Sequence, residues 1–372
     1  MKQSLHKKPT IVVIGLKGLP GFGGAATVGE NIINRLKGEF RFTVLSVETH
    51  ADKGFELGDV RQIIFKKFPI SKLNIFVYYI RCALYVLFCK KHDLVHLHHT
   101  DGAFILPLLK LRNRVVLTSH ARPQEHVKWS NWVNCFFKIN EKIAIRLADT
   151  YTAVSKPLQR TYKKHYNREI MYIPNGVDLE AAKLEVHSNN GEPYLLFAAG
   201  RIIQSKGLHI LLQALRAINF TNKIKIAGNL DQVAEYKKQI LELSSGLNVE
   251  FLGMIKEKST LLKLVANAEV FVYPTLYEAM SIMLLEAASV KVPVICSDIP
   301  ANTAIFSNDE LTLFESENVE DLKKKIKYFY EHKDEASLKT HKAFKKLEKS
   351  HSWLGIAMQY KVVFEVLMKE RS

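Results

Sequence analysis

The chain has 372 residues, of which 47% are hydrophobic and 24% charged, with four cysteines and a formal net charge of +16. This length exceeds what one hydrophobic core normally holds, so we expect two domains, and the composition excludes a largely disordered chain. The cysteines show no C-x-x-C spacing, which argues against a disulfide framework or a thiolate metal site and predicts reduced, mostly buried thiols.

The positive charge lies almost entirely in the first half of the chain. Residues 1–186 hold 29 lysines and arginines against 15 acidic residues, whereas the remainder holds 24 against 22. A basic half of this kind suits nucleic acid, an anionic membrane surface or a phosphorylated substrate, and it also suits a protein that only needs solubility. Charge alone does not choose among these.

The apolar segments predict neither a secretory signal nor a transmembrane helix. Ile11–Leu16 is too short for the apolar core of a signal and is expected to be the first strand. Leu73–Cys89 comes nearest to a membrane span, but Arg81 interrupts it, so we expect a buried or interfacial helix. These features predict a cytoplasmic protein.

Short apolar strands alternate with helix-length segments through the first half, which is the rhythm of βαβ units in a parallel sheet. Helices are expected over Thr27–Lys37 and Trp129–Asn140. The second of these would have one apolar face, made by Trp129, Trp132, Val133, Phe136 and Phe137. The expected strands are Ile11–Gly15, Phe42–Val47, Leu94–His98, Val115–Ser119 and Thr150–Val154.

The polar stretch His187–Pro193 is the expected linker, and the same alternation begins again after it. We therefore predict an α/β protein with two Rossmann-like doubly wound parallel-sheet domains, residues 1–186 and 187–352. Asp321–Lys349 is expected to be helical, and Ser352–Lys369 to be a final amphipathic helix. The expected strands of the second half are Leu195–Ala199, Ile224–Ala227, Val249–Leu252, Val270–Val272 and Pro293–Cys296.

Glycines crowd the turn between the first strand and the first helix, in the sequence GLKGLPGFGG. Glycines let the backbone approach a ligand closely, and the N-terminus of the following helix offers free N–H groups to an anion. The spacing is not G-x-G-x-x-G and no acidic residue ends the second strand, so a dinucleotide site is not expected. The alternative is a flexible loop that only makes the turn. These glycines are Gly15, Gly18, Gly21, Gly23 and Gly24.

Histidines gather at strand ends of the first half. His120 directly follows the strand VVLTS, where it could hydrogen-bond a sugar hydroxyl or act as an acid or base. His96 and His98 are expected on one face of a strand, with His99 beside them. A metal cluster is conceivable there, but no third ligand is clear, so we do not expect a metal.

The sequence GRIIQSKG, residues 200–207, follows the first strand of the second half. Arg201 and Lys206 flank a short loop before a helix that is expected to begin at Gly207. Two cations beside a helix N-terminus form a site for a diphosphate. The alternative is two surface cations at a turn.

The sequence PTLYEAMSIMLLEAAS, residues 274–289, is the most specific motif. Glu278 and Glu286 stand eight positions apart, which fits a loop residue and a helix residue that converge on one ligand. The turn between them would present the backbone amides of Ile282, Met283 and Leu284 at a helix N-terminus. Amides that hold phosphate, and carboxylates that accept hydroxyl groups, together describe a nucleotide sugar.

These motifs resemble the retaining glycosyltransferases of the GT-B fold, often called family four or group 1, over essentially the whole chain. The resemblance rests on GR-x-x-x-x-KG, on the two spaced glutamates, on PNGVD at residues 174–178 and on the final helix that opens at Trp353. It implies two Rossmann-like domains facing each other across a cleft, with residues 353–372 crossing back to the first. It also implies transfer of a sugar from a nucleoside-diphosphate sugar to a glycan or lipid-linked acceptor, with retention, in bacterial cell-surface polysaccharide assembly.

By this resemblance Arg201 and Lys206 hold the donor diphosphate and neutralise the charge that develops on the leaving group. Glu286 accepts the ribose hydroxyls, Glu278 contacts the transferred sugar, and His120 binds the same sugar from the first domain. No metal or other cofactor is implied, because cations and helix dipoles take its place. The expected donor-binding residues are Gly23, Gly24, Ala25, Gly200, Ser281, Ile282, Met283, Leu284 and Glu286.

The chain departs from the family pattern at Ala279 and Ser281, and at Ser289–Lys291 before Pro293, where glycines are usual. Ser281 keeps the backbone amide and adds a hydroxyl, so the choice of donor would differ while the chemistry survives. The opening GLKGLPGFGG is similar to that of polysaccharide-assembly members, with Lys17 where arginine is common.

The basic first domain would bind a lipid-diphosphate-linked acceptor and rest on the anionic cytoplasmic leaflet of the inner membrane. Leu73–Cys89 and the Trp129–Phe137 face could dock there, although core packing is the expected role of both. Alternatives are a non-catalytic sugar-nucleotide-binding protein, an epimerase or hydrolase of the same fold and, from another class, a basic nucleic-acid-binding protein. No recognisable nucleic-acid-binding module is present, so nucleic acid is not an expected partner.

Overall fold

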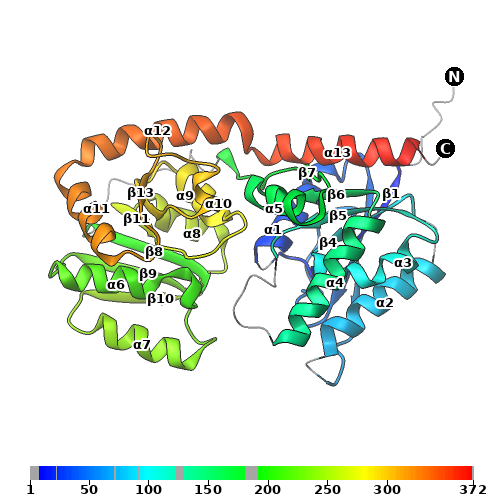
Figure 1. Ribbon diagram of the computed structural model, residues 1–372, viewed down its shortest axis with the longest axis horizontal. Coiled ribbons are helices and arrows are strands. Elements are labelled where there is room, and N and C mark those ends of the chain that lie inside the picture. The colour runs from blue at the N-terminus through cyan, green and yellow to red at the C-terminus, as the bar shows by residue number, and fades with distance from the viewer. Residues whose placement is uncertain are drawn as a thin grey trace. The chain divides into compact units, whose positions relative to one another are not determined.

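The computed structural model describes residues 8–21, 23–70, 73–89, 92–122, 130–180 and 192–370. The chain divides into two compact units (Figure 1). The first unit is Met1–Asn175 with Trp353–Ser372, and the second unit is Gly176–Ser352. The expected linker His187–Pro193 and the expected boundary after residue 186 fall largely on residues 181–191, which lie outside the described residues.

Seven parallel strands form the sheet of the first unit, in the order β3-β2-β1-β4-β5-β6-β7. The winding reverses between β1 and β4, as in doubly wound sheets, whose ligands bind beyond the carboxyl ends of the strands. β1, β2 and β4 are buried almost throughout, as apolar runs covered on both faces must be. The strands are β1 Thr10–Lys17, β2 Arg41–Val47, β3 Arg61–Phe65, β4 Leu94–His98, β5 Arg114–Ser119, β6 Thr150–Ala153 and β7 Met171–Tyr172.

Helices cover this sheet and tie its strands together. The Tyr78 hydroxyl of α2 donates to the carbonyl of Leu45 at 2.7 Å and accepts from the amide of Gly15 at 2.9 Å. α5 begins after Ser155, whose Oγ accepts from the amide of Leu158 at 3.3 Å. The helical segments are α1 Gly24–Leu36, α2 Asn74–Phe88, η2 Thr100–Ile105, α3 Leu106–Leu109, α4 Asn131–Leu147, α5 Lys156–Tyr166 and α13 Trp353–Lys369.

The last helix, α13, belongs to the first unit, which confirms the expected return of the chain. It packs against α1 and against strands β4 and β5. Tyr360 of α13 is fully buried, with its hydroxyl 3.2 Å from Thr118 Oγ1 and its ring centroid 5.3 Å from that of His96. Lys361 forms an ion pair with Glu39 beside α1. The first unit is therefore completed by the end of the chain.

Six parallel strands form the sheet of the second unit, in the order β10-β9-β8-β11-β12-β13. Its core lies between β8, β9 and β11 and the apolar faces of α6, α7 and α11. The strands are β8 Tyr194–Arg201, β9 Lys223–Asn229, β10 Val249–Gly253, β11 Val270–Tyr273, β12 Val294–Ser297 and β13 Thr312–Phe314. The helical segments are η5 Gln204–Lys206, α6 Leu208–Ala217, α7 Ala234–Ser244, α8 Lys258–Ala266, α9 Ile282–Ser289, α10 Pro300–Thr303, α11 Val319–Glu331 and α12 Lys333–Ser350.

The expected strands are all present, but β3, β7 and β13 were not expected. Each of the three is the outermost strand of its sheet, and edge strands are short and less apolar than central ones. The helical structure expected over Asp321–Lys349 is confirmed, but the segment forms two helices, α11 and α12. The chain breaks at His332, because α11 packs against α6 whereas α12 packs against α9.

The core packing expected for the aromatic face of α4 is wrong for two of its residues. Trp132 is 87% exposed and Phe136 is 37% exposed, whereas Val133 and Phe137 are half-buried. The buried residues of α4 lie further along the helix, at Asn140, Glu141, Ala144 and Ile145. Trp129 lies outside the described residues. The core packing expected of α2 is confirmed on one side of the helix, and Phe76, Leu84 and Phe88 are exposed on the rest. The buried residues of α2 are Tyr78, Tyr79, Cys82, Ala83 and Val86.

None of the four cysteines, all within the described residues, forms a disulfide. Cys82 and Cys296 are buried, whereas Cys89 and Cys135 are exposed, so the expectation of mostly buried thiols holds for only half of them. Among the described residues, no helix combines the length and the apolar character needed to cross a membrane.

Replacing Tyr360 by alanine should lower the free energy of unfolding by about 3–5 kcal/mol, because it leaves a cavity between α13 and the sheet. Val362→Ala on the same helix is the matched control. Its side chain is 58% exposed, so the loss should stay within about 0.5 kcal/mol. Urea unfolding followed by circular dichroism measures both variants, and equal losses would contradict the packing of α13 on the sheet.

Candidate functional site

Two loops of the second unit meet at the carboxyl ends of neighbouring strands, β8 and β11. The carbonyl of Ser205 accepts hydrogen bonds from the amide of Leu276 at 2.9 Å and from Thr275 Oγ1 at 3.1 Å. Ser297 Oγ, at the end of β12, donates to the carbonyl of Thr275 at 2.5 Å. The motifs at residues 200–207 and 274–289, which are far apart in sequence, therefore form one structure.

Gly207 makes this contact possible. Its φ is +72°, and a Cβ atom at this position would stand 1.8 Å from the carbonyl oxygen of Pro274. Only glycine adopts this backbone conformation at little cost and also leaves room for the neighbouring carbonyl. Gly207 is the N-cap of α6, which begins at Leu208, one residue after the expected start.

Lys206 and Glu278, which were expected to bind different parts of a donor, form an ion pair with each other. Tyr273 at the end of β11 donates from its hydroxyl to Glu278 Oε1 at 2.6 Å, and Ser281 Oγ donates to the Tyr273 hydroxyl at 2.7 Å. Burial, followed by the charge of Glu278, raises the pKa of Tyr273 well above its usual value, so the phenol remains a donor. Tyr273 was not among the expected residues, because as the last residue of an apolar strand it is typical of a core position.

The helix α9 begins at Ile282 with Ser281 as its N-cap. Ser281 Oγ accepts from the amide of Leu284 at 3.3 Å. The Leu284 amide, expected as a donor to phosphate, is therefore already used within the chain. The amides of Ile282 and Met283 belong to the first turn, where the helix itself supplies no acceptor.

Glu286 lies within α9, and its side chain is only 7% exposed. It forms an ion pair with Lys258, the first residue of α8, whose side chain is 51% exposed. Burial raises the pKa of Glu286, and the charge of Lys258 opposes that rise. Lys258 was not among the expected residues, since no motif includes it.

Gly200 and Arg201 form the exposed end of β8, where the pairing with β9 is irregular. Among the described residues, no side-chain contact joins Arg201 to the network of Lys206, Glu278, Tyr273 and Ser281. The structure thus brings Lys206 and Glu278 into direct contact and links Ser281 to them through Tyr273, and it places Arg201 at the end of the strand that leads into the same loop.

In the first unit, Gly23 is the N-cap of α1 with a φ of 106°, and the amide of Thr27 donates to its carbonyl at 3.0 Å. Gly23 and Gly24 are exposed, and a Cβ atom on either would meet nothing within 4 Å. Packing within the chain therefore does not explain why a glycine stands at Gly24. Ala25 follows in the first turn, and together these small residues leave the N-terminus of α1 open.

His120 belongs to a stack of histidines at the carboxyl end of β4 and β5. Its Nε2 lies 2.9 Å from His98 Nδ1, and the ring centroids of His96 and His98 are 4.0 Å apart, as expected for one strand face. Burial and neighbouring imidazoles lower the pKa of His96 to about 3 and that of His120 well below its usual value. These imidazoles are therefore neutral near pH 7, and His120 offers hydrogen bonds rather than a positive charge.

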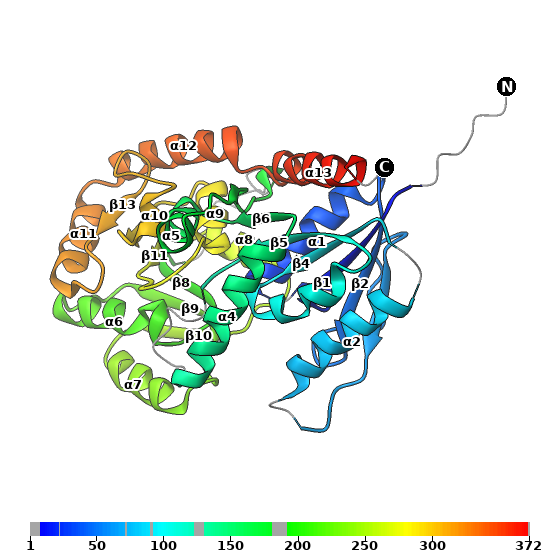
Figure 2. The ribbon, with the colours of Figure 1, turned by 45° about the vertical axis from the view of Figure 1, so that its right-hand side comes forward.

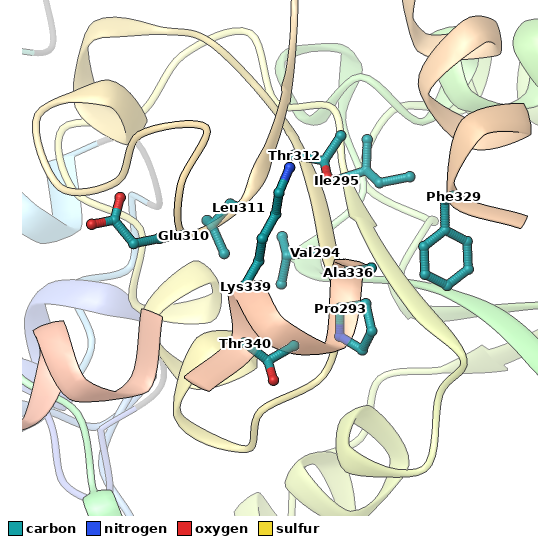
Figure 3. A pocket seen from close by; sticks show the side chains of 10 residues that line it. All are labelled: Pro293, Val294, Ile295, Glu310, Leu311, Thr312, Phe329, Ala336, Lys339 and Thr340. Carbon is teal, nitrogen blue, oxygen red and sulfur yellow. The ribbon is translucent and has the colours of Figure 1, made fainter. Parts of the chain in front are cut away.

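No group of histidine, cysteine, aspartate and glutamate side chains in the described parts of the chain is arranged to hold a metal ion. A small pocket of the second unit lies elsewhere, where β12 and β13 meet α11 and α12 (Figure 3). Lys339 and Thr340 line it from α12, and Glu310, which lines its other side, pairs with Lys346 at 2.8 Å. It contains none of the residues expected to bind a donor.

Two sequence-family models match this chain, one after the other along its length. Residues 22–181 match Glycosyltransferase Family 4, and residues 180–350 match Glycosyl transferases group 1. The chain belongs to the group 1 glycosyltransferases. The two parallel-sheet units are those of the GT-B fold.

Two relatives extend this assignment. The glycosyltransferase is 24% identical over 359 residues to an uncharacterized glycosyltransferase of Methanocaldococcus jannaschii, which covers 94% of this chain and 96% of that protein. It is 26% identical over 281 residues to the O-antigen chain mannosyltransferase RfbU of Salmonella typhimurium, which covers 72% of this chain and 76% of that one.

Solved structures share the fold of this glycosyltransferase. Sucrose-phosphate synthase from Thermosynechococcus elongatus matches with a TM-score of 0.82 at 18% identity, over 98% of this chain and 100% of that one. Anabaena HepE, solved in complex with UDP-glucose, matches with a TM-score of 0.75 at 15% identity, over 96% of this chain and 100% of that one.

Gly207→Ala should destabilise the glycosyltransferase by about 2–4 kcal/mol, because alanine is strained at this φ and its Cβ would overlap the Pro274 carbonyl. Gly200→Ala is the matched control at the end of β8, just before the same loop. A Cβ there meets nothing within 4 Å, so the change in stability should be less than about 0.5 kcal/mol. Thermal unfolding compares the two. A Gly207→Ala protein as stable as the control would show that the loops do not need this close contact.

Proposed function

We propose that this glycosyltransferase moves a sugar from a nucleoside-diphosphate sugar to a glycan or lipid-linked acceptor of a cell-surface polysaccharide, with retention of configuration and without a metal ion. The main support for this proposal is the network of Lys206, Glu278 and Ser281 at the N-terminus of α9. A cation, a carboxylate and free helix amides at one point fit a diphosphate that carries a sugar. The named relatives support the proposal, since one is an O-antigen chain mannosyltransferase and another was solved with UDP-glucose.

In this proposal the donor diphosphate lies against the amides of Ile282 and Met283, and Lys206 turns from Glu278 toward it. Arg201 adds a second cation at the end of β8. Glu278, released from Lys206 but still held by Tyr273, contacts the transferred sugar. Stabilising the departing diphosphate supplies most of the catalysis, and losing one such contact costs about 3 kcal/mol, or roughly a hundredfold in rate.

The deciding experiment is a thermal shift of the protein with UDP, GDP and dTDP, each with and without EDTA. A nucleotide at a hundred times its dissociation constant should raise the apparent stability by about 2.7 kcal/mol. A shift with one nucleotide that EDTA leaves unchanged supports a metal-independent donor site and names the base. If no nucleotide shifts the protein, the alternative of a non-catalytic relative of this fold is favoured.

Two variants test the roles proposed for Glu286 and Lys206, through the nucleotide-induced thermal shift and the rate of sugar transfer. Glu286→Ala should weaken the nucleotide shift, because the ribose loses its acceptor, whereas Lys206→Ala should mainly slow sugar transfer. Equal nucleotide affinity and equal transfer rate in both variants would contradict the site.

The acceptor side is proposed to meet an anionic lipid surface, on the cytoplasmic face of a membrane. α2 and α4 run along the same side of the first unit (Figure 2). They are joined through Phe104 of η2, whose ring centroid lies 4.9 Å from that of Phe76 on α2 and 5.9 Å from that of Phe136 on α4. Trp132 and Ile139 extend this aromatic patch along α4, exposed by 87% and 51%.

Charge on the same helices favours an anionic partner. α4 exposes Lys138, Lys142 and Arg146, and its carboxylate, Glu141, is buried in an ion pair with Arg122. α2 has no acidic residue at all. Each lysine or arginine near an anionic leaflet contributes about 1 kcal/mol, and exposed aromatic residues insert at the lipid interface.

Vesicle co-sedimentation tests this surface with phosphatidylcholine alone and with phosphatidylglycerol added. The protein should bind the anionic vesicles, with binding that fades as salt rises. Trp132→Ser should weaken binding about tenfold or more, since a buried tryptophan contributes roughly 1.5–3 kcal/mol. Leu338→Ser, on a residue 67% exposed on α12 of the second unit, is the matched control. Binding that ignores lipid charge, or that both variants weaken equally, would exclude this surface.

A further inference from the structure

The ion pair between Lys258 and Glu286 joins two helices of the second unit. Lys258 is the first residue of α8, Glu286 lies in the middle of α9, and the two helices pack against each other. The two side chains differ in their surroundings, since the carboxylate is almost fully buried whereas half of the lysine side chain faces solvent. Lys258 thus lies between the buried carboxylate of Glu286 and the solvent.

A buried carboxylate depends on such a partner. Taking its charge out of water is costly, and a carboxylate without a cation responds by binding a proton. Two helices, α8 and α12, pack against α9. Of the charged groups on these helices, Lys258 is the one that lowers the pKa of Glu286, and burial raises that pKa by more. α9 itself has no other titratable residue.

The protonation of Glu286 decides what it can bind. An ionised carboxylate accepts from both of its oxygens, so it can receive two neighbouring hydroxyl groups, whereas a carboxylic acid must use one oxygen as a donor. A ribose presents two such hydroxyls. Hydrogen bonds to a charged acceptor are also the stronger ones.

We propose that Lys258 is a positioning residue for the nucleotide donor, which holds Glu286 ionised and in place to accept the ribose hydroxyls. This inference rests on the proposed function, in which Glu286 binds the ribose. Lys258 acts through Glu286 and does not contact the reacting atoms. A residue outside both recognisable motifs therefore sets the affinity for the donor.

The test uses whichever of UDP, GDP and dTDP stabilises the wild type. Calorimetry measures the affinity of each variant for that nucleotide between pH 6 and pH 8.5. Comparing variant with wild type at each pH cancels the protonation of the nucleotide itself. Lys258→Met should bind within about threefold of the wild type at pH 8.5. The difference should widen as the pH falls toward 6, approaching about tenfold for each pKa unit that the buried carboxylate gains when it loses its cation.

Three further variants separate this role from general damage. Lys258→Arg keeps the cation and should stay within about threefold of the wild type throughout. Lys256→Met removes an exposed lysine two residues away and should change nothing. In a Glu286→Gln background, Lys258→Met should have no additional effect at any pH, since the group through which it acts is gone.

The possible failures are distinct. A Lys258→Met effect that is constant across pH, or that persists in the Glu286→Gln background, would overturn the inference while leaving the donor site intact. Tighter binding by Lys258→Met would show that Lys258 competes with the ribose for Glu286, which also overturns it. If the wild type binds none of the three nucleotides, the proposed function itself fails.

Discussion

The candidate donor site depends on the contact between Gly207 and the backbone of Pro274. This contact holds the loop after β8 against the loop after β11, and the two hydrogen bonds to Ser205 continue it on one side. Without it, Lys206 and Glu278 would sit on separate loops at the ends of separate strands. Residue 207 must be glycine, because every other side chain begins with a Cβ atom that would overlap the carbonyl of Pro274. A single steric limit thus places a cation and a carboxylate together.

Once these loops are joined, electrostatics determines how the charged side chains of the site pair. Each glutamate of the 274–289 motif is paired with a lysine, Glu278 with Lys206 and Glu286 with Lys258. Partly buried charges are costly alone, and pairing with a lysine compensates each carboxylate and fixes its orientation. In the proposed donor complex a diphosphate would replace Glu278 as the partner of Lys206, whereas a ribose would bind Glu286 beside Lys258, so neither group would have to order a free side chain. Tyr273 and Ser281 contribute to the same arrangement, since Tyr273 donates to Glu278 and Ser281 caps the N-terminus of α9.

The sequence could predict the two-sheet architecture, the returning helix and the loops that carry the site, because strand periodicity and strand-end motifs are local properties. It could not predict which charges pair. Lys258 lies on a different helix from Glu286, and their contact exists only because α8 packs on α9. The Leu284 amide looked free because the spacing of a motif does not show that Ser281 caps the helix. Trp132 looked like a core residue because an apolar helical face in sequence is the same whether it is covered by protein or open to solvent.

The return of α13 to the first unit has a consequence for how the protein is made. Residues 1–175 leave the ribosome first, yet the surface of β4 and β5 that carries His96 and Thr118 stays uncovered until Trp353–Lys369 has been synthesised. The second unit is continuous in sequence and can be finished earlier. The part begun first is thus the part completed last. A chain that stops before residue 353 would leave this normally buried side of the sheet exposed, and surface of that kind is what chaperones and proteases act on.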